Sequence, residues 1–410
     1  MSGRRPMRIA LLAGDWNLDG PSGLGGGIET YVRVMAAGLA AAGHDVHVVA
    51  RATAYTRTIV AGGVHLHGLV VPDEWPAEAA HLGEARDALA FAWHAWRQVR
   101  ALAATGGPFA IVEAPEYKAQ GYYAARDASL PLVVKCHAHL KLCLDLNGVP
   151  LGADTALLAD LERETLTRAR AVHANSRALA ERCGADYGLP ASRFVHVPYG
   201  IDTRRFTPTP SALREAWGVV DTPVALFVGR METRKGIETL VPAFAALVAQ
   251  MPDATLVVAG PDTVGPVGRA SQWQAMSEAW AAAGVPPDRI RLLGPVAHES
   301  LPAIYSACDV MVAPSLYEAF GLVYLEAMAC GCVPIGCAAG GVPAIVADGV
   351  TGRLVPPGDA LALAAVMAEL LTDAEQRKRM AAAGRAVVER TYSLDAVVAR
   401  TEAFYREVAA

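Results

Sequence analysis

Short apolar runs alternate with amphipathic segments along the first half of the chain. Helical spacing of apolar residues at 29–43 and 87–105 predicts two helices between such runs. Nearly continuous apolar strands that alternate with helices are typical of a parallel sheet covered on both faces. The runs that predict strands are 8–14, 45–50, 63–69, 109–114, 131–136, 171–176 and 193–198.

The alternation stops at 199–211, a stretch rich in proline and threonine without a periodic apolar face, and then begins again. In the part of the chain after this stretch, apolar runs predict strands at 224–230, 254–260, 290–294, 310–315, 333–337 and 352–355. At 410 residues the chain is also too long for one ordinary core. We therefore predict an α/β fold of two Rossmann-like, doubly wound domains facing a central cleft. The predicted parts are an N-terminal domain (1–198), a linker (199–211), a C-terminal domain (212–391) and a last helix (392–410) that crosses back to the first domain.

Composition narrows the class of protein. Hydrophobic residues make up 53% of the chain and charged residues 19%, which is typical of a folded, well-buried protein. A net charge of −5 argues against a broad nucleic-acid-binding surface. The apolar runs are too short to span a membrane. Seven cysteines, an odd number without a C-x-x-C pair, indicate reduced, buried thiols and a cytoplasmic location.

Two glutamates in the segment 317–337, YEAFGLVYLEAMACGCVPIGC, are the strongest candidates for chemistry. Glu318 is expected at the start of a helix and Glu326 about two turns further on. The backbone N–H groups at a helix start lack intrahelical partners and suit an anion. The alternative is that Glu318 only caps the helix and Glu326 is a solvated helix residue. The residues expected to offer the amides are Phe320, Gly321 and Leu322.

A glycine-rich stretch, PSGLGGGIETYV (21–32), precedes the first predicted helix. Such glycines let the backbone approach a phosphate at a helix start. A nicotinamide-binding unit would need the same chemistry, but there the glycines follow the strand directly and an acidic residue ends the second strand. Here a loop intervenes and the second strand ends in Ala50–Arg51, which disfavours that cofactor. A tight turn without ligand remains the other interpretation.

Basic and histidine side chains follow several predicted strands. His137 stands at a strand end, where open α/β sheets bind ligands, although a lone histidine is often structural. Arg230 and Lys235 follow a strand of the second half and suit a diphosphate, with surface solvation as the alternative. The chain contains no D-x-D sequence, so we predict neither a metal ion nor another cofactor, and cationic side chains would neutralise the leaving group.

Taken together, these motifs resemble the retaining GT-B glycosyltransferases of the large family that includes sucrose and sucrose-phosphate synthases and bacterial mannosyl- and N-acetylglucosaminyltransferases. One departure is Ala344, where a carboxylate often follows the GGxP turn. The stretches that carry the resemblance are GGGIE (25–29), His137, VPYGIDTRRF (197–206), GRMETRKG (229–236), EAFGLVYLE (318–326) and GGVPAIVADGVTGRLVPPGD (340–359).

The resemblance implies a role for each matching position. Glu326 would hold the ribose hydroxyls of a nucleotide, and Glu318 the hydroxyls of the transferred sugar. His137 would contact that sugar and orient the reacting centre. The groups implied around the rest of the donor are Arg230, Lys235, Gly26 and Gly27 at the diphosphate, the amides of Phe320, Gly321 and Leu322 at the sugar, and Gly294 to Val296 at the base.

The activity so implied is metal-independent transfer of a sugar, with retention of configuration by a same-face mechanism, from a nucleotide-diphosphate sugar to a small polar acceptor. UDP-sugars are the first expectation and GDP-sugars the second. The alternatives are a nicotinamide-dependent oxidoreductase, a phosphorylase or a non-catalytic sugar-nucleotide-binding protein. We expect neither nucleic acid nor a transmembrane segment among the partners, and the sequence does not indicate an oligomeric state. Candidate acceptor residues, expected in loops at strand ends, are Trp16, Asn17, Glu116, Tyr117, Lys135 and His139.

Overall fold

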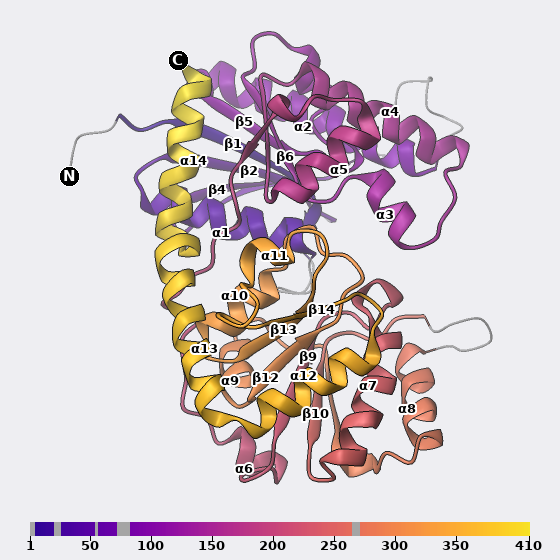
Figure 1. Ribbon diagram of the computed structural model, residues 1–410. Helices are drawn as coiled ribbons and strands as arrows, with labels where there is room; N and C mark the ends of the chain where they lie inside the picture. Colours follow the sequence, from indigo (N-terminus) through magenta and orange to yellow (C-terminus); the bar gives the residue numbers. More distant parts are fainter. Residues whose placement is uncertain (1–4, 20–25, 54–55, 72–82, 265–270) are drawn as a thin grey trace. The chain divides into compact units, whose positions relative to one another are not determined.

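A computed structural model describes residues 5–19, 26–53, 56–71, 83–264 and 271–410 (Figure 1). The chain divides into two compact units, residues 1–200 with 394–410 and residues 201–393. Most of the predicted linker, 201–211, therefore belongs to the second unit. The last helix, α14 (Leu394–Ala409), belongs to the first unit and packs against α1 (Gly27–Ala41), where Gly38 leaves room for Val398.

The first unit is built on an eight-stranded sheet in the order β3-β4-β2-β1-β5-β6-β7-β8. Every neighbouring pair is parallel except β3 and β4. The strands are β1 (Arg8–Asn17), β2 (Asp45–Arg51), β3 (Arg57–Ala61), β4 (Val64–Leu69), β5 (Ile111–Pro115), β6 (Leu132–Cys136), β7 (Ala171–Ala174) and β8 (Phe194–His196). Besides α1 and α14, its helices are α2 (Glu84–Gly106), α3 (Leu140–Leu146), α4 (Ala153–Arg168) and α5 (Arg177–Tyr187).

The antiparallel strand β3 is absent from the sequence prediction. It forms a hairpin with β4 through Gly62 and Gly63, whose φ angles are +58° and +81°. Two successive residues with positive φ are the requirement of the tight hairpin turn that matches strand twist, and glycine meets it without steric cost. The hairpin places β3 at the edge of the sheet.

The second unit contains a six-stranded parallel sheet in the order β11-β10-β9-β12-β13-β14. Its first strand, β9 (Val224–Val228), lies in the middle. The chain adds strands on one side of β9 and then returns to add strands on the other, so the order switches between β9 and β12 (Val310–Ala313). The other strands are β10 (Thr255–Ala259), β11 (Ile290–Gly294), β13 (Val333–Cys337) and β14 (Arg353–Val355).

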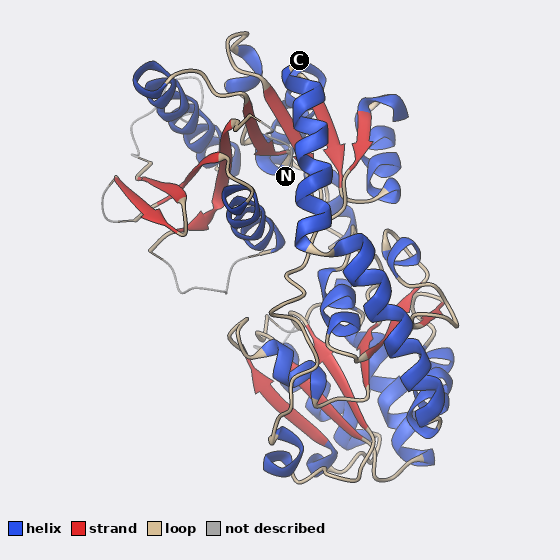
Figure 2. Cartoon of the chain, turned by 90° about the vertical axis from the view of Figure 1, so that its left-hand side faces the viewer, coloured by secondary structure: helices blue, strands red, loops and turns tan. Residues whose placement is uncertain are grey.

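Helices cover both faces of this sheet (Figure 2). Leu256 and Val258 of β10 belong to a core that includes residues of α7, α8 and α12, whereas Val257, equally buried, points to the opposite face. The two parallel sheets with helices around them confirm the predicted α/β class. The helices of this unit are α6 (Leu213–Trp217), α7 (Ile237–Gln250), α8 (Gln272–Ala282), α9 (Leu301–Ser306), α10 (Leu322–Ala329), α11 (Val342–Ile345), α12 (Ala360–Thr372) and α13 (Ala374–Val387).

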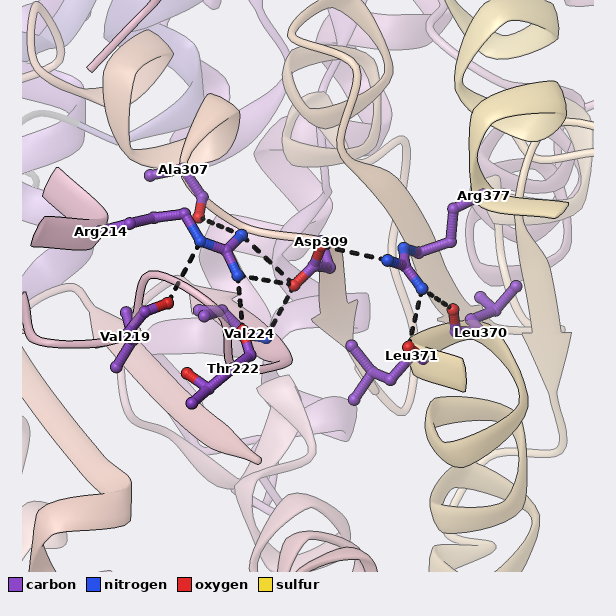
Figure 3. A network of polar contacts seen from close by, with 9 residues as sticks. All are labelled: Arg214, Val219, Thr222, Val224, Ala307, Asp309, Leu370, Leu371 and Arg377. Atoms are coloured by element: carbon purple, nitrogen blue, oxygen red, sulfur yellow. Dashed lines mark hydrogen bonds and ion pairs between the residues drawn. The ribbon is translucent and has the colours of Figure 1, made fainter. Parts of the chain in front are cut away.

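Asp309, directly before β12, holds the amino-terminal side of this sheet together (Figure 3). Its Oδ2 accepts a hydrogen bond of 2.8 Å from the backbone N–H of Val224 and lies 3.3 Å from Nη2 of Arg214 on α6. Its Oδ1 lies 3.3 Å from Nη2 of Arg377 on α13. Both guanidinium groups also donate to backbone carbonyls, so this network joins α6, β9 and α13 to β12.

Two further expectations from the sequence concerned membrane-spanning helices and the state of the cysteines. Among the described residues, the helices are too short or too polar to cross a lipid bilayer. The seven cysteines carry free thiols, and all but Cys143 are buried.

Candidate active site

The carboxyl ends of β9 and β12 lie side by side where the strand order switches. Open α/β sheets bind ligands at this place, because the loops after the two strands turn to opposite faces and leave room between them. The loop after β9 carries Arg230 and Lys235, and the loop after β12 carries Glu318. Three residues predicted from the sequence therefore lie in the two loops at the switch point of the second unit.

Glu318 is 9% exposed and is surrounded by basic groups. Nζ of Lys235 donates a hydrogen bond to its Oε1, and Nη1 of Arg234 lies 3.9 Å from the same oxygen. Burial alone would raise the pKa of Glu318, but the charges of Lys235 and Arg234 hold this pKa below its ordinary value. Glu318 is therefore an ionised carboxylate at neutral pH.

Backbone contacts fix the two loops against each other. Leu316 donates a 3.0 Å hydrogen bond to the carbonyl of Arg234, and the carbonyl of Glu318 accepts a 2.7 Å bond from Gly341. Gly236 has a φ of +73°, and a Cβ there would lie 1.8 Å from the carbonyl oxygen of Pro314. Only glycine allows this approach, so the glycine after Lys235 positions the lysine.

Arg230 extends from the same loop into solvent, with its side chain 60% exposed. Its contact with Glu232 is long, at 3.4 Å, whereas Arg234 binds that glutamate at 2.6 Å. An exposed arginine held by one long contact keeps most of its donors available for an anion.

Glu326 is buried on α10, and its two oxygens are held by different elements. The hydroxyl of Tyr305 on α9 donates a 2.8 Å hydrogen bond to Oε2, and Nε2 of His298 lies 3.4 Å from Oε1. Glu326 is thus not the solvated helix residue of the alternative interpretation. Nor does Glu318 cap α10, since the N-cap position is Gly321 and no side chain caps it. The alternatives stated for both glutamates are wrong.

The first turn of α10 lies beside Glu318, as the spacing predicted. Gly321 has a φ of +98°, and an added Cβ would lie 2.5 Å from Cδ2 of Tyr324 and 3.7 Å from Cγ of Glu318. A larger residue would push the helix start away from this carboxylate. Phe320 is buried and Leu322 begins the helix.

Gly294, expected near a base, ends the edge strand β11, and Val296 lies two residues beyond it. Gly294 has a φ of +68° and accepts a 2.8 Å hydrogen bond from Gly260. Gly260 in turn lies so close to Gly229 that a Cβ would be 1.9 Å from the Gly229 carbonyl oxygen. The ends of β11, β10 and β9 therefore form one continuous rim.

In the first unit, His137 follows β6 and is buried among aromatic rings. Its Nδ1 is hydrogen-bonded to the Tyr199 hydroxyl, and the Tyr31 ring lies edge-on at 5.0 Å. Its backbone N–H donates a 2.7 Å hydrogen bond to Oε1 of Glu116. Burial, reinforced by the nearby charge of Lys135, holds the pKa of His137 well below its usual value, so the ring is neutral at pH 7.

Glu116 and Lys135, predicted to line an acceptor pocket, are both fully buried. Lys135 lies inside β6 and donates a 2.6 Å hydrogen bond to the carbonyl of Val197, so the expectation that it stands in a loop is wrong. Oε2 of Glu116 is buried without a hydrogen-bond partner. Burial, with the charge of Glu162 second, raises the pKa of Glu116 to about 8.

The other candidates in the first unit differ in exposure. His139 is buried, and its Nε2 is hydrogen-bonded at 2.6 Å to Asp186, a structural contact. Trp16 and Asn17 end β1, and Asn17 is exposed. Tyr117 is partly buried on the short turn after β5.

Gly26 and Gly27 open α1 and are exposed, and an added Cβ at either would meet nothing within 4 Å. Packing therefore does not explain these two glycines, which leaves close approach of a ligand as the better reason for them. Gly25 and the preceding part of the glycine-rich stretch lie outside the described residues.

Sequence analysis missed four groups that complete the site in the second unit: Arg234, His298, Tyr305 and Ser315, whose hydroxyl lies 3.4 Å from Oε1 of Glu318. Arg234 and Ser315 could have been predicted from the sequence, because both lie within three residues of Lys235 or Glu318. Tyr305 and His298 carry no such signal. Tyr305 reaches Glu326 because α9 packs against α10, and His298 lies in the loop that leads into α9.

Comparisons with known proteins agree with this arrangement. The family described as "Glycosyl transferase 4-like domain" matches residues 26–200. The family described as "Glycosyl transferases group 1" matches residues 211–387. The first match lies within the first structural unit and the second within the second.

Individual relatives and one solved structure match large parts of the chain. A D-inositol 3-phosphate glycosyltransferase of Xylanimonas cellulosilytica is 32% identical over 95% of this chain and 94% of its own length. An alpha-D-kanosaminyltransferase of Streptomyces kanamyceticus is 29% identical over 70% of this chain and 73% of its own. Among solved structures, sucrose-phosphate synthase from Thermosynechococcus elongatus superposes with a TM-score of 0.81 at 26% identity, covering 98% of this chain and 99% of the other. The chain therefore belongs to the glycosyltransferases of the GT-B fold.

Proposed function

We propose that this glycosyltransferase transfers a sugar from a nucleotide-diphosphate sugar to a small, hydroxyl-rich acceptor, with retention of anomeric configuration and without a metal ion. Membership of the family removes the nicotinamide oxidoreductase from the alternatives. UDP-sugars are the first donor class to test. GDP-sugars are the second, since a mannosyltransferase relative from Mycolicibacterium smegmatis, 34% identical over 51% of this chain, is named as GDP-mannose-dependent.

The observation that carries the proposal is the pairing of Lys235 with Glu318 at the switch point, with Glu326 on the helix that follows. Lys235 and Arg230 supply the positive charge that a departing nucleoside diphosphate needs. Glu326, held by the Tyr305 hydroxyl, accepts hydrogen bonds from the ribose hydroxyls. Glu318 accepts hydrogen bonds from the sugar hydroxyls and fixes the sugar relative to the diphosphate.

Retention follows from a same-face displacement, in which an oxygen of the donor phosphate takes the proton of the acceptor hydroxyl. The protein then contributes orientation and charge stabilisation, and a covalent intermediate is not needed. His137 contributes as a neutral ring that orients the sugar, because burial and the Lys135 charge disfavour its protonated form.

The acceptor is proposed to be a small polyhydroxylated ring compound. The relative named as a D-inositol 3-phosphate glycosyltransferase supports this class. In the first unit, Trp16, Asn17 and Tyr117 are the acceptor candidates that reach the surface, whereas Lys135 and His139 act as structural groups. Six buried thiols support action in the reducing cytoplasm.

The experiment is a donor panel followed by an acceptor panel. UDP-, GDP- and ADP-sugars are incubated with the protein in the presence of EDTA, and the released nucleotide is measured. The best donor is then combined with inositol 3-phosphate, inositol and aminocyclitols. The anomeric proton coupling of the product reports retention or inversion.

Transfer in EDTA with the donor's configuration retained is the expected result. Inverted product would refute the same-face mechanism, and activity that appears only with added Mg²⁺ or Mn²⁺ would refute metal independence. A chain that binds a nucleotide sugar but neither hydrolyses nor transfers it would favour the non-catalytic alternative.

A further inference from the structure

A cluster of histidines lies on β2 and β4 of the first sheet, on the other side of β1 from β6, the strand that His137 follows. Asp45 begins β2, His47 is its third residue, and the register pairs His47 with His65, the second residue of the parallel strand β4. His67 lies two residues further along β4 and therefore on the same face as His65. His137 follows the carboxyl end of β6, whereas these residues gather near the amino ends of β2 and β4.

Three ligand atoms converge within this cluster. Oδ1 of Asp45 lies 3.1 Å from Nε2 of His47 and 3.6 Å from Nε2 of His65. All three atoms lie within 4.8 Å of one another. Ligands bound at about 2.0–2.1 Å in a tetrahedral site are roughly 3.3–3.4 Å apart, so the spacing fits one small cation bound by all three atoms.

The buried histidine of the cluster has a ring nitrogen without a well-formed hydrogen bond. His47 is 5% exposed, and its Nε2 lies 3.1 Å from Oδ1 of Asp45 without the geometry of a hydrogen bond. When Nε2 carries no proton, its lone pair faces the carboxylate and is repelled. A cation between the two groups removes that repulsion, and a buried polar atom without a partner calls for such an explanation.

The groups behind His47 can hold the tautomer that a metal ligand requires. Nδ1 of His47 is 2.9 Å from Nε2 of His67, and Nδ1 of His67 is 3.0 Å from the hydroxyl of Thr58 on β3. When His47 donates its Nδ1 proton to His67, and His67 donates to Thr58, the lone pair of His47 Nε2 points toward Asp45. Histidine ligands of metals are oriented by such hydrogen bonds from their second nitrogen.

The remaining contacts allow a cation to enter. Arg8 holds the other oxygen of Asp45, Oδ2, at 3.0 Å and leaves Oδ1 available. The rings of His47 and His65 are nearly parallel, at 13°, so His65 must turn to aim its lone pair at a shared ion. Its side chain is 39% exposed and is therefore free to turn, and solvent can supply the remaining ligand.

We propose that Asp45, His47 and His65 bind one divalent transition-metal ion of the zinc class, which ties β2 to β4. Two imidazoles and one carboxylate are the donor set that zinc, cobalt and nickel accept, whereas magnesium and calcium prefer oxygen ligands alone. The site is separate from the donor residues of the second unit, so the proposal is independent of the proposed function and of its metal independence.

The test uses full-length protein without an affinity tag, stripped with EDTA and dialysed. Cobalt chloride is titrated while the visible absorption of bound Co²⁺ is recorded, and zinc chloride is then added as a competitor. The same titration is done with Asp45→Asn, His65→Gln and His67→Gln, and with His94→Gln, which removes a histidine of α2 as the matched control. Circular dichroism of each metal-free variant checks its fold.

The proposal predicts one Co²⁺ per chain in the wild type and in His94→Gln, displaced by Zn²⁺. Affinity falls about tenfold or more in Asp45→Asn and His65→Gln, and about 10–100-fold in His67→Gln, which removes the group that orients His47. Wild-type affinity in folded His65→Gln would overturn the proposal. Thiolate-to-cobalt absorption bands would overturn it too, since they would assign the ion to cysteines. Lack of cobalt and zinc binding to the wild type would do the same.

Discussion

Nζ of Lys235 donates a hydrogen bond to Oε1 of Glu318, so a lysine and a glutamate of the two loops at the switch point pair with each other. The lysine follows β9 and the glutamate follows β12, and the two meet only because these strands are neighbours in the sheet. A diphosphate that binds Lys235 must therefore share the ammonium group with Glu318. The pair holds both side chains in place before the donor arrives, which lowers the cost of ordering them on binding.

Glu318→Gln separates donor binding from turnover. The variant frees Lys235 from its negative partner, so UDP affinity is expected to stay equal or to rise up to about tenfold. Turnover is expected to fall about 10²–10³-fold, because the hydroxyl contacts that orient the sugar weaken. Nucleotide release and calorimetric titration of UDP measure the two effects. The matched control is Glu238→Gln, an exposed glutamate bonded to Thr233 in the same region. Wild-type turnover in Glu318→Gln would contradict the role of Glu318.

Glu326→Gln tests recognition of the nucleoside. Loss of the carboxyl group is expected to cost about 1.5–3 kcal/mol of UDP binding, and Tyr305→Phe about 0.5–1.5 kcal/mol through looser positioning of Glu326. Inhibition by inorganic pyrophosphate, which lacks a ribose, should not change in either variant. Equal losses for UDP and pyrophosphate would mean that Glu326 supports the whole site and does not read the ribose.

Asp309→Asn tests the network at the other end of the second sheet. The change leaves Arg214 and Arg377 without their carboxylate and is expected to lower the stability of the second unit by about 2–3 kcal/mol. Chemical denaturation followed by tryptophan fluorescence measures the loss. Glu375→Gln, which removes an exposed pair with Lys378, should leave the midpoint unchanged. A folded Asp309→Asn protein with the wild-type denaturation midpoint would show that the network contributes little to the stability of the second unit.

Glu116→Gln tests a pH effect with a defined sign. The pKa of Glu116 is about 8 in the folded chain and near its ordinary 4.5 in the unfolded chain. Between these values the folded state keeps a proton that the unfolded state loses, so this group lowers stability as pH rises from 4.5 to 8. The variant removes that slope while Gln still accepts from the His137 amide. The difference between the melting temperature of the variant and that of the wild type should therefore increase from pH 5 to pH 8.

The control for this slope is Glu181→Gln, an exposed change on α5 that should keep the wild-type pH dependence. Parallel melting curves of the wild type and Glu116→Gln across this pH range would place the pKa of Glu116 near its ordinary value. They would then show that the buried carboxyl is ionised.

The sequence was sufficient to predict most of the fold, because buried parallel strands leave unbroken apolar runs. The strand it missed, β3, is a half-exposed edge strand whose residues Ile59 and Val60 face solvent, so it has no buried run. The Gly62–Gly63 pair was the available signal, since two glycines between β-branched runs are typical of a hairpin. The helix bounds shifted by a few residues, as at α1, which begins at Gly27.

The candidate site was predictable where its residues follow a strand or begin a helix, as Lys235, Glu318 and Glu326 do. Contacts between elements that are distant in the sequence could not be predicted from it. Tyr305 reaches Glu326 through the packing of α9 on α10, and Lys135 is buried because its strand is covered on both faces. The histidine cluster of β2 and β4 also depends on strand register, which pairs His47 with His65 and which spacing along the chain does not reveal.

The most direct test of the central claim is calorimetric titration of UDP and of uridine, in EDTA, into the wild type and Lys235→Ala. The account predicts that the wild type binds UDP without a metal ion. Lys235→Ala should lower the affinity for UDP by about 10–100-fold and leave the affinity for uridine almost unchanged, because uridine has no diphosphate. UDP binding that needs added Mg²⁺ or Mn²⁺, or that is equal in both proteins, would contradict the account.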